Sequence, residues 1–275
     1  MIFRSLLRDC LVLNWALPVG SLPPLPEPLR YQTHPWSDSP HVFASALLFR
    51  HERLRLDPVP LVRVSYPQLS LRLCVLDGDG APAVLFRSVL VPGWVLLSAR
   101  LVAGQPARFA RFSYPRPSRT PEASGWRWQV TQKSTLVVAA AQGSPGVGVG
   151  PDLGSWENTT TYFHDRRSGY VLGGGGLRRV ALSPRPSALW PMKAEVEETG
   201  LLLECLPDAG AEGWPPLHSA WLCPEIPSVF ELGPVVELSK LRRTTPSVAT
   251  DPAMFGSKAT DPRRSVPPLV ARTAA

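Results

Sequence analysis

Lysine is scarce in this chain: four of its 275 residues are lysines, whereas 25 are arginines. Lys240 and Lys258 lie near the C-terminus, which leaves Lys133 and Lys193 for the rest of the sequence. Enzymes that form an imine with a carbonyl substrate need a lysine whose pKa is lowered in a desolvated pocket. Lys133, between two apolar runs, is the one internal candidate, although a strand-end lysine with its ammonium group in water explains it more simply.

Motifs for metal binding and for nucleophilic catalysis are also missing. The four cysteines, Cys10, Cys74, Cys205 and Cys223, contain no C-x-x-C pair, and the five histidines form no H-E-x-x-H. No G-x-S-x-G is present, so a hydrolase nucleophile elbow has no support. We therefore expect neither a metal site nor a cofactor, and we expect Cys74 and Cys205 to be buried thiols.

No apolar run reaches the roughly 18 residues that a membrane-spanning helix needs. The N-terminal stretch "MIFRSLLRDCLVLNWAL" resembles a signal peptide at first sight. However, Arg8 and Asp9 interrupt its apolar run, and no A-x-A-type cleavage site follows. These features predict a cytoplasmic protein that does not use a membrane as its partner.

Charge is distributed unevenly along the chain. The net charge is +7, and residues 239–275 carry seven basic against two acidic side chains, so the remainder is close to neutral. The same segment loses hydrophobic periodicity and repeats "ATDP". We expect a folded domain over 1–238 and a basic, disordered tail over 239–275. The near-neutral domain gives no reason to expect a nucleic-acid partner.

Short runs rich in Val and Leu, separated by turn residues and 32 prolines, are typical of an all-β domain. "LDGDGAP" (76–82) predicts a hairpin loop, and "GWVLLSARLVAG" (93–104) predicts a short helix that ends near Gly104 and Pro106. Many strands with few helices favour a barrel or a sandwich. The strand runs are 41–50, 59–66, 68–76, 83–90, 109–114, 126–132, 134–141, 159–165, 169–174, 177–183, 193–205 and 218–223.

Several stretches together carry a family resemblance. "LPPLPEPLRY" (22–31), "SYPQLSLRLCVLDGDGAPAVLFRSVL" (65–90) and "LLSARLVAGQPARFARF" (96–112) are followed in order by "SWENTTTYFHD" (155–165), "ALWPMKAEVEE" (188–198) and "HSAWLCPEI" (218–226). Over about 15–235 the chain resembles the YqjF-like domain-of-unknown-function family of the acetoacetate decarboxylase-like superfamily. The resemblance implies a cone-shaped, mostly antiparallel β-barrel with peripheral helices and a central pocket.

The chain differs from the decarboxylases at the position of their catalytic lysine. Their imine-forming lysine follows a Gly-x-Pro-like turn, which corresponds here to residues 104–106. Ala107 stands in place of that lysine, and Arg108 matches a second lysine. A guanidinium stays protonated in proteins and cannot act as the amine nucleophile.

A second departure concerns the pocket glutamate of the decarboxylases, which lies in a Tyr-x-Glu element. The corresponding residues here are Tyr66-Pro67-Gln68, and an amide cannot exchange a proton as a carboxylate does. The arginine that receives the substrate carboxylate in those enzymes would fall within one residue of Arg8. The resemblance therefore implies the scaffold without the decarboxylase reaction.

Polar residues that match the YqjF-like pattern are candidates for the pocket: Arg72, Ser88, Arg100, Glu157 and Tyr162, together with Gln68 and Arg108. Arg72 lies between apolar neighbours on a strand, so it would face the interior and need a partner. Glu157 could form a structural ion pair with it. Alternatively, the guanidinium could hold a ligand carboxylate.

Three functions remain open from the sequence. The first is a small-molecule-binding barrel that holds a carboxylate or an apolar metabolite. The second is a lyase-like or hydratase-like enzyme on oxo acids, with Lys133 or the pair Glu157 and Tyr162 carrying the chemistry. The third is an interaction protein that acts through the basic tail. The oligomeric state is open.

Overall fold

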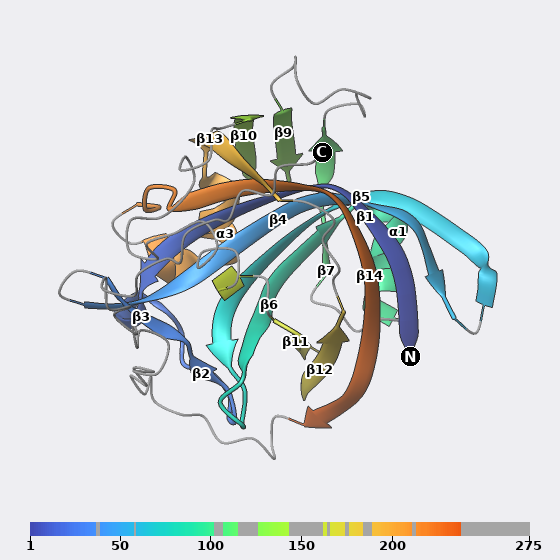
Figure 1. The fold of residues 1–275 in the computed structure, drawn as a ribbon, viewed down its shortest axis with the longest axis horizontal. Coiled ribbons are helices and arrows are strands. Elements are labelled where there is room, and N and C mark those ends of the chain that lie inside the picture. Colours follow the sequence, from blue (N-terminus) through green and yellow to red (C-terminus); the bar gives the residue numbers. More distant parts are fainter. Residues whose placement is uncertain are drawn as a thin grey trace, which may run out of the picture.

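The computed structural model describes residues 1–36, 39–57, 59–101, 107–114, 126–142, 162–163, 166–173, 176–183, 189–210 and 213–237. Within these residues the chain is built almost entirely of β-strands (Figure 1). None of the helices in the described ranges is long and apolar enough to cross a membrane.

Seven strands close into a barrel (Figure 1). Around the ring they follow the order β1 (Ile2–Pro18), β4 (Ser39–Leu56), β5 (Val59–Leu76), β6 (Pro82–Val91), β11 (Ser168–Gly173), β12 (Gly176–Leu182) and β14 (Ser219–Glu237). Antiparallel pairing of β1 with β14 closes the ring, for instance Leu7 with Ile226. All pairs in the ring are antiparallel except β6 with β11, which is parallel. The expected mainly-β, mostly antiparallel barrel is confirmed.

A second layer covers one outer side of the barrel. From β14 the sheet continues through β13 (Trp190–Glu198), β10 (Thr135–Gln142), β9 (Trp126–Thr131) and β8 (Arg111–Ser113). Trp128 of β9 and Met192 of β13 belong to the same buried cluster as Trp15 of β1 and Leu71 of β5. Helix α3 (Gly200–Cys205) and the 3-10 turns η1 (Val19–Ser21) and η2 (Pro207–Gly210) lie on this side, and their apolar side chains complete the cluster.

The remaining elements are short. β2 (Arg30–Tyr31) pairs with β5, β3 (Thr33–Trp36) pairs with β4, and β7 (Ala107–Phe109) runs parallel to β6. Helix α1 (Gly93–Leu101) connects β6 to the segment before β7 and packs beside them. Its start agrees with the helix expected over 93–104, whose end lies outside the described residues.

Because the long strands are covered on both faces, their two alternating sets of side chains serve two different cores. On β5, Leu69, Leu71 and Leu73 are buried in the cluster between the barrel and the second layer. The alternate residues of the same strand, including Gln68 and Arg72, point into the barrel.

Two bulges keep the interior face of the barrel apolar. Asp9 and Arg53 adopt positive φ angles of 54° and 53°, and the strand register shifts beside each of them. A bulge inserts an extra residue and so resets the alternation. As a result Leu7 and Cys10, three residues apart on β1, both line the interior, and His51 and Leu54 do the same on β4.

Of three local structures expected from the sequence, one is confirmed and two are wrong in part. The "LDGDGAP" hairpin is confirmed: Asp77 Oδ1 accepts the backbone N–H of Asp79 at 3.0 Å and of Ala81 at 2.9 Å. The strand expected over 193–205 is wrong in its second half, where the apolar face of α3 docks on the second layer. The strand expected over 159–165 is wrong at its two described residues, Tyr162 and Phe163, which are helical.

A candidate ligand-binding site inside the barrel

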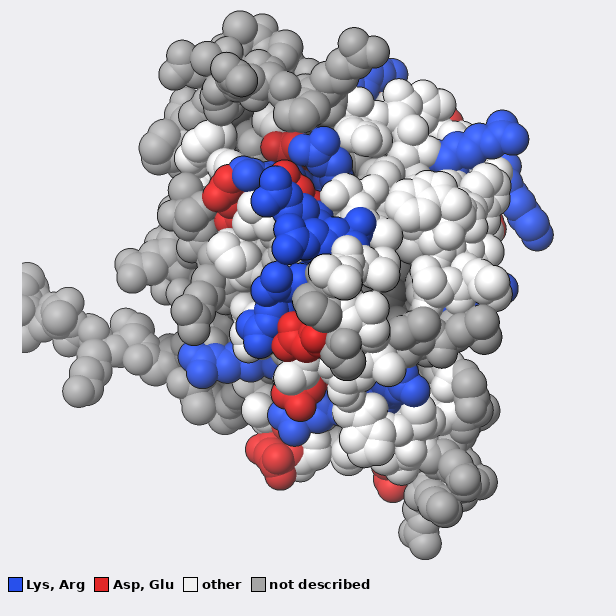
Figure 2. Space-filling model, turned by 90° about the vertical axis from the view of Figure 1, so that its right-hand side faces the viewer, with Lys and Arg blue, Asp and Glu red and all other residues white. Residues whose placement is uncertain are grey.

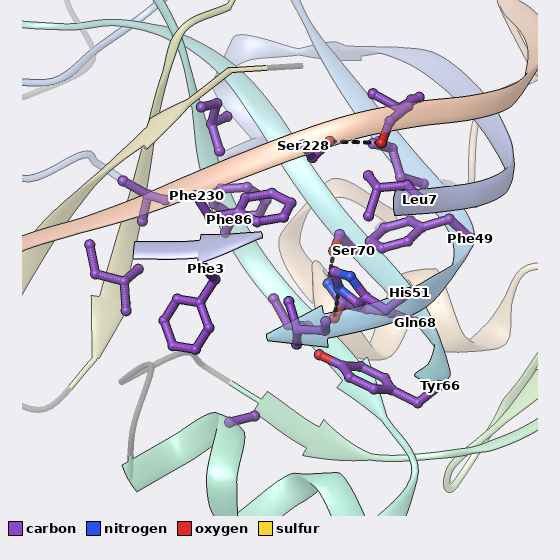
Figure 3. A pocket seen from close by; sticks show the side chains of 18 of the residues that line it. Phe3, Leu7, Phe49, His51, Tyr66, Gln68, Ser70, Phe86, Ser228 and Phe230 are labelled. Atoms are coloured by element: carbon purple, nitrogen blue, oxygen red, sulfur yellow. Dashed lines mark hydrogen bonds between the residues drawn. The ribbon is translucent and has the colours of Figure 1, made fainter. Parts of the chain in front are cut away.

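A cavity of about 390 Å³ lies inside the barrel. That volume falls within the roughly 300–1,000 Å³ typical of small-molecule pockets. Its described lining comes from all seven ring strands and from α1, and is mainly apolar (Figure 3). The apolar side chains labelled in that view, which lie near His51, Gln68 and Ser70, are those of Phe3, Leu7, Phe49, Phe86 and Phe230. None of the described lining residues is a lysine, an aspartate or a glutamate.

Strand β5 supplies the longest row of lining residues. Every second position from the hairpin to the barrel interior faces the cavity: Val62, Val64, Tyr66, Gln68, Ser70 and Arg72. This is the period-2 alternation of a strand, and it changes from apolar to polar along its length. The cavity therefore has an apolar half and a polar half.

Hydrogen bonds join His51, Gln68 and Ser70 in the polar half (Figure 3), and Ser5 extends this chain beyond the residues that line the cavity. Ser5 Oγ lies 2.9 Å from His51 Nδ1, His51 Nε2 lies 3.2 Å from Gln68 Oε1, and Gln68 Nε2 donates to Ser70 Oγ at 2.8 Å. All four side chains are buried. Burial lowers the pKa of His51 to about 4, so the imidazole is neutral near pH 7.

The direction of each hydrogen bond in this chain follows from Gln68. Its amide nitrogen donates to Ser70, so its oxygen must accept from His51, which places the imidazole proton on Nε2. Nδ1 is then the acceptor for the Ser5 hydroxyl. At the other end, Ser70 accepts from Gln68 and keeps its own proton for another acceptor; in the described part of the chain no group accepts it.

Two arginines lie next to this end of the cavity. Arg166, 2% exposed, donates from Nη1 to the carbonyl of Ala83 at 2.8 Å, and its guanidinium carbon lies 4.9 Å from the ring centroid of Tyr162. Among the described residues, its Nε and Nη2 have no hydrogen-bond partner, and neither has Nε of Arg72. Burial, and to a smaller extent the charge of Arg166, lowers the pKa of Arg72 to about 10, so the Arg72 guanidinium is charged at pH 7.

Aromatic side chains close the barrel beyond the arginines. Phe163 packs against Phe43 and Trp221, with ring centroids 5.1 Å and 5.2 Å apart. Tyr162 packs on Phe43 at 5.4 Å, and burial raises the pKa of its phenol. Tyr162 therefore supports this end of the barrel and carries the Arg166 guanidinium on its ring face, while Phe163 and Arg166 contact the cavity.

The opposite end of the cavity is open. Val59 and Val62, on the hairpin between β4 and β5, line the cavity and are also exposed, and Val95 and Ala99 of α1 line it from the other side. Leu61, Trp94 and Leu97 on the same two elements are 93%, 65% and 68% exposed. On that side of the molecule, basic and acidic side chains form a mixed band beside a broad uncharged surface (Figure 2).

Ion pairs hold part of that band. Arg4 pairs with Asp57 at 3.0 Å, and Arg8 pairs with Glu52 at 2.6 Å and with Glu225. Arg8, which the resemblance aligns with a substrate-binding arginine, does not contact the cavity and is occupied by two carboxylates.

The other expected site residues are separated by the fold. Gln68 and Arg72 line the cavity, whereas Ala107 is packed beside it among the apolar residues of β6 and α1. Arg100 lies outside, where its Nε donates to the carbonyl of Ala107 at 2.8 Å. Ser88 is buried, and like Ala107, Arg100 and Tyr162 it is not among the described lining residues.

Arg108 and the two described lysines lie elsewhere. Arg108 turns toward α3, with Nη2 2.5 Å from Glu204 Oε1 and Nη1 3.6 Å from Cys205 Sγ. Lys133, in the turn between β9 and β10, and Lys193 on β13 are both exposed. Glu157 and the tail over 239–275 lie outside the described residues.

Four residues of the site were missed by sequence reasoning: Ser5, His51, Ser70 and Arg166. A signal existed for Ser70, because it shares the parity of Gln68 and Arg72 on one strand. His51 and Ser5 could be found only with the β1–β4 register, and Arg166 lies just after the strand predicted over 159–165.

Comparison with known proteins agrees with the fold. Residues 4–220 match DUF2071, a family described as an uncharacterized conserved protein. The chain belongs to this family. No curated protein matches the sequence.

Solved structures of the same fold are distant in sequence. The enduracididine biosynthesis enzyme MppR with HEPES buffer bound matches with a TM-score of 0.57 and 12% identity, covering 86% of this chain and 88% of that one. The same enzyme complexed with pyruvate matches with a TM-score of 0.54 and 11% identity over 89% and 90% of the two chains. An acetoacetate decarboxylase-like enzyme from Sphingomonas wittichii RW1 matches with a TM-score of 0.53 and 14% identity over 90% and 94%. The fold of this DUF2071 protein is thus acetoacetate decarboxylase-like.

Proposed function

We propose that this DUF2071 protein binds a small molecule inside its barrel and does not form an imine with it. The observation that carries the proposal is the cavity itself, which is apolar, open at one end and lined by no described lysine or carboxylate. Ala107, at the position of the decarboxylase lysine, and Gln68, at that of the pocket glutamate, fit a site that holds its ligand without the decarboxylase reaction.

The structural relatives support a small-molecule ligand. MppR is described in complexes with pyruvate and with the condensation product of pyruvate and imidazole 4-carboxaldehyde. A barrel of the same fold with a cavity of about 390 Å³ is suited to a ligand of similar or greater size. The four buried cysteines are free thiols, which fits the cytoplasmic location expected from the sequence.

The enzymatic alternative has less support. If a lysine carried the reaction, its amine would have to be desolvated, whereas Lys133 is exposed in a turn. If Tyr162 carried the reaction, its phenol would have to lie near the ligand. Tyr162 instead packs behind the cavity wall, and burial raises its pKa.

Binding of a neutral apolar dye, 1-N-phenylnaphthylamine, tests the proposal. We expect one dye per folded chain, and we expect Ala99→Trp, which fills the open end, to weaken binding at least tenfold. Leu97→Trp is the matched control, because Leu97 lies on the outer face of the same helix and is 68% exposed. Equal weakening by both variants, or no saturable binding to the wild type, would contradict the proposal.

Reduction with borohydride tests the second half of the proposal. In the presence of pyruvate or acetoacetate, an imine would be trapped as a mass increase on a lysine. We expect the intact mass to stay unchanged. A stoichiometric adduct on any lysine would show that the protein does form an imine.

A further inference from the structure

Hydrogen-bond donors gather at the inner end of the cavity, and no group in the described part of the chain accepts from them. The donors are the Ser70 hydroxyl, Nε of Arg72 and the Nε and Nη2 groups of Arg166. Burying donors and positive charge without partners costs free energy, in the range of several kcal/mol for an ion. A fold that retains such an arrangement next to a cavity is suited to a ligand that supplies the missing acceptors.

The orientation of the Gln68 amide, with its nitrogen toward Ser70, fixes Ser70 as a donor to a further group. If Gln68 were turned so that its oxygen faced Ser70, its amide group would face the imidazole instead. The observed order Ser5, His51, Gln68, Ser70 passes each proton in one direction and ends with the free proton on Ser70. Ser70 and Arg72 are two residues apart on the same face of β5, so both can bind the same functional group of a ligand.

The two arginines are not equally satisfied. Arg166 already has the Ala83 carbonyl and the face of Tyr162, and both interactions offset part of its charge. For Arg72, no described residue provides a hydrogen bond to Nε, and no carboxylate is among the described lining residues. Among the described residues, Arg72 is therefore the less satisfied of the two guanidinium groups.

The rest of the cavity is mainly apolar, although Arg55 and Ser98 also line it. From Tyr66 to Val62 the β5 row is apolar apart from the tyrosine hydroxyl, and Phe3, Leu54, Phe230 and α1 complete the walls. Arg72 and Tyr66 are six residue steps apart on β5, roughly 20 Å at 3.3 Å per residue, and Val62 lies four steps further along the strand. A ligand whose head is held at Arg72 would therefore pass Ser70 and Gln68 before its remainder reaches the apolar half.

We infer that the ligand is an amphipathic monocarboxylate, whose carboxylate binds Arg72, Ser70 and Arg166 and whose apolar tail runs toward α1. A planar carboxylate matches the fork of a guanidinium and accepts the Ser70 proton as well. The inference rests on the proposed function, since it requires that the cavity hold a small molecule.

Calorimetric titration with decanoate, 1-decanol and pyruvate tests this inference on the wild-type protein. We expect decanoate to bind at least tenfold more tightly than 1-decanol, because only the acid supplies the anion. We expect pyruvate to bind at least a hundredfold more weakly than decanoate, because it has no tail. Equal affinity for decanoate and decanol, or tighter binding of decyl phosphate than of decanoate, would overturn the inference while leaving a small-molecule barrel in place.

Arginine variants locate the head of the ligand. Arg72→Met should reduce the affinity for decanoate at least tenfold and leave that for 1-decanol unchanged. Arg63→Met is the matched control, because Arg63 is exposed on the same strand and is not among the residues that line this cavity, and it should change neither affinity. An equal loss in both variants would overturn the assignment of the head to the inner end. Failure of all three ligands and of the neutral dye would instead refute the proposed function itself.

Discussion

His51 Nε2 lies 3.2 Å from Gln68 Oε1 inside the barrel. With an amide as its partner the imidazole gains no countercharge, and burial holds its pKa at about 4. This neutral pair orders the polar half of the cavity, because it fixes the imidazole tautomer and leaves the last proton of the chain on Ser70.

The low pKa of His51 makes the fold sensitive to acid. In the unfolded chain the imidazole titrates near its ordinary pKa of about 6.5. Between that value and 4 the unfolded state binds more protons than the folded state, so stability is complete above pH 6.5 and falls as the pH decreases toward 4. We expect the free energy of unfolding to drop by roughly 3 kcal/mol from this group over that interval.

Urea unfolding at pH 7 and at pH 4.5 measures this loss, with His51→Gln as the control that lacks the titrating group. The variant should lose less stability on acidification than the wild type. An identical loss in both proteins would mean that other groups cause the acid sensitivity.

Gln68→Glu should reverse the electrostatics of the cavity. A carboxylate beside His51 favours the imidazolium, so the pKa of His51 should rise above 6. The carboxylate would also accept the Ser70 proton and repel an anionic ligand, so decanoate should bind at least tenfold more weakly. A pH titration of the imidazole signals by NMR and calorimetry with decanoate measure the two effects.

Gln68→Met serves as the control for that variant, because it removes the amide without adding a charge. Its His51 should keep a low pKa. If decanoate binding were unchanged in Gln68→Glu despite a raised His51 pKa, the ligand would not lie at this end of the cavity.

Arg72→Met should make the empty protein more stable. The guanidinium is buried without a carboxylate among the described residues around the cavity, and replacing a buried charge by an apolar side chain of similar volume is often stabilising. We expect a gain of about 1–3 kcal/mol in the free energy of unfolding by urea. A loss of similar size would indicate that Arg72 forms a structural ion pair, for which the sequence offers Glu157 as a partner.

Arg108→Met should affect stability and not binding. Arg108 joins β7 to Glu204 of α3, and Glu204 also accepts from Ser134 Oγ at 2.9 Å. Because this ion pair is only partly buried, we expect a cost of about 1 kcal/mol and an unchanged affinity for decanoate. A tenfold weaker affinity would place Arg108 at the ligand after all.

The fold could be anticipated, but less from strand patterns than from the order of the matching stretches. The run through β1 was not recognised as a strand, because Arg8 and Asp9 interrupt its apolar sequence. In the structure Asp9 forms a bulge, and Arg8 points to Glu52 and Glu225. Pro67 likewise divided one strand of 18 residues into two predicted runs, although β5 continues through it, paired with Arg50.

The sequence predicted residues of the site correctly only on strand β5. Gln68 and Arg72 share a parity on β5 and line the cavity together. Ser88 and Arg100 match the family pattern as Arg72 does, but their positions depend on which layer each strand or helix covers. His51 meets Gln68 only because β4 and β5 pair in one register across a bulge, which the sequence alone does not specify.

Native mass spectrometry of the freshly purified protein tests the central claim most directly. The account predicts a folded chain that carries one small molecule, which leaves on denaturation and is recovered as an organic acid with an apolar chain. Purified Ala99→Trp should carry none, while Leu97→Trp should carry the same molecule as the wild type. A wild-type protein that stays free of any ligand, even after incubation with decanoate and the neutral dye, would contradict the account.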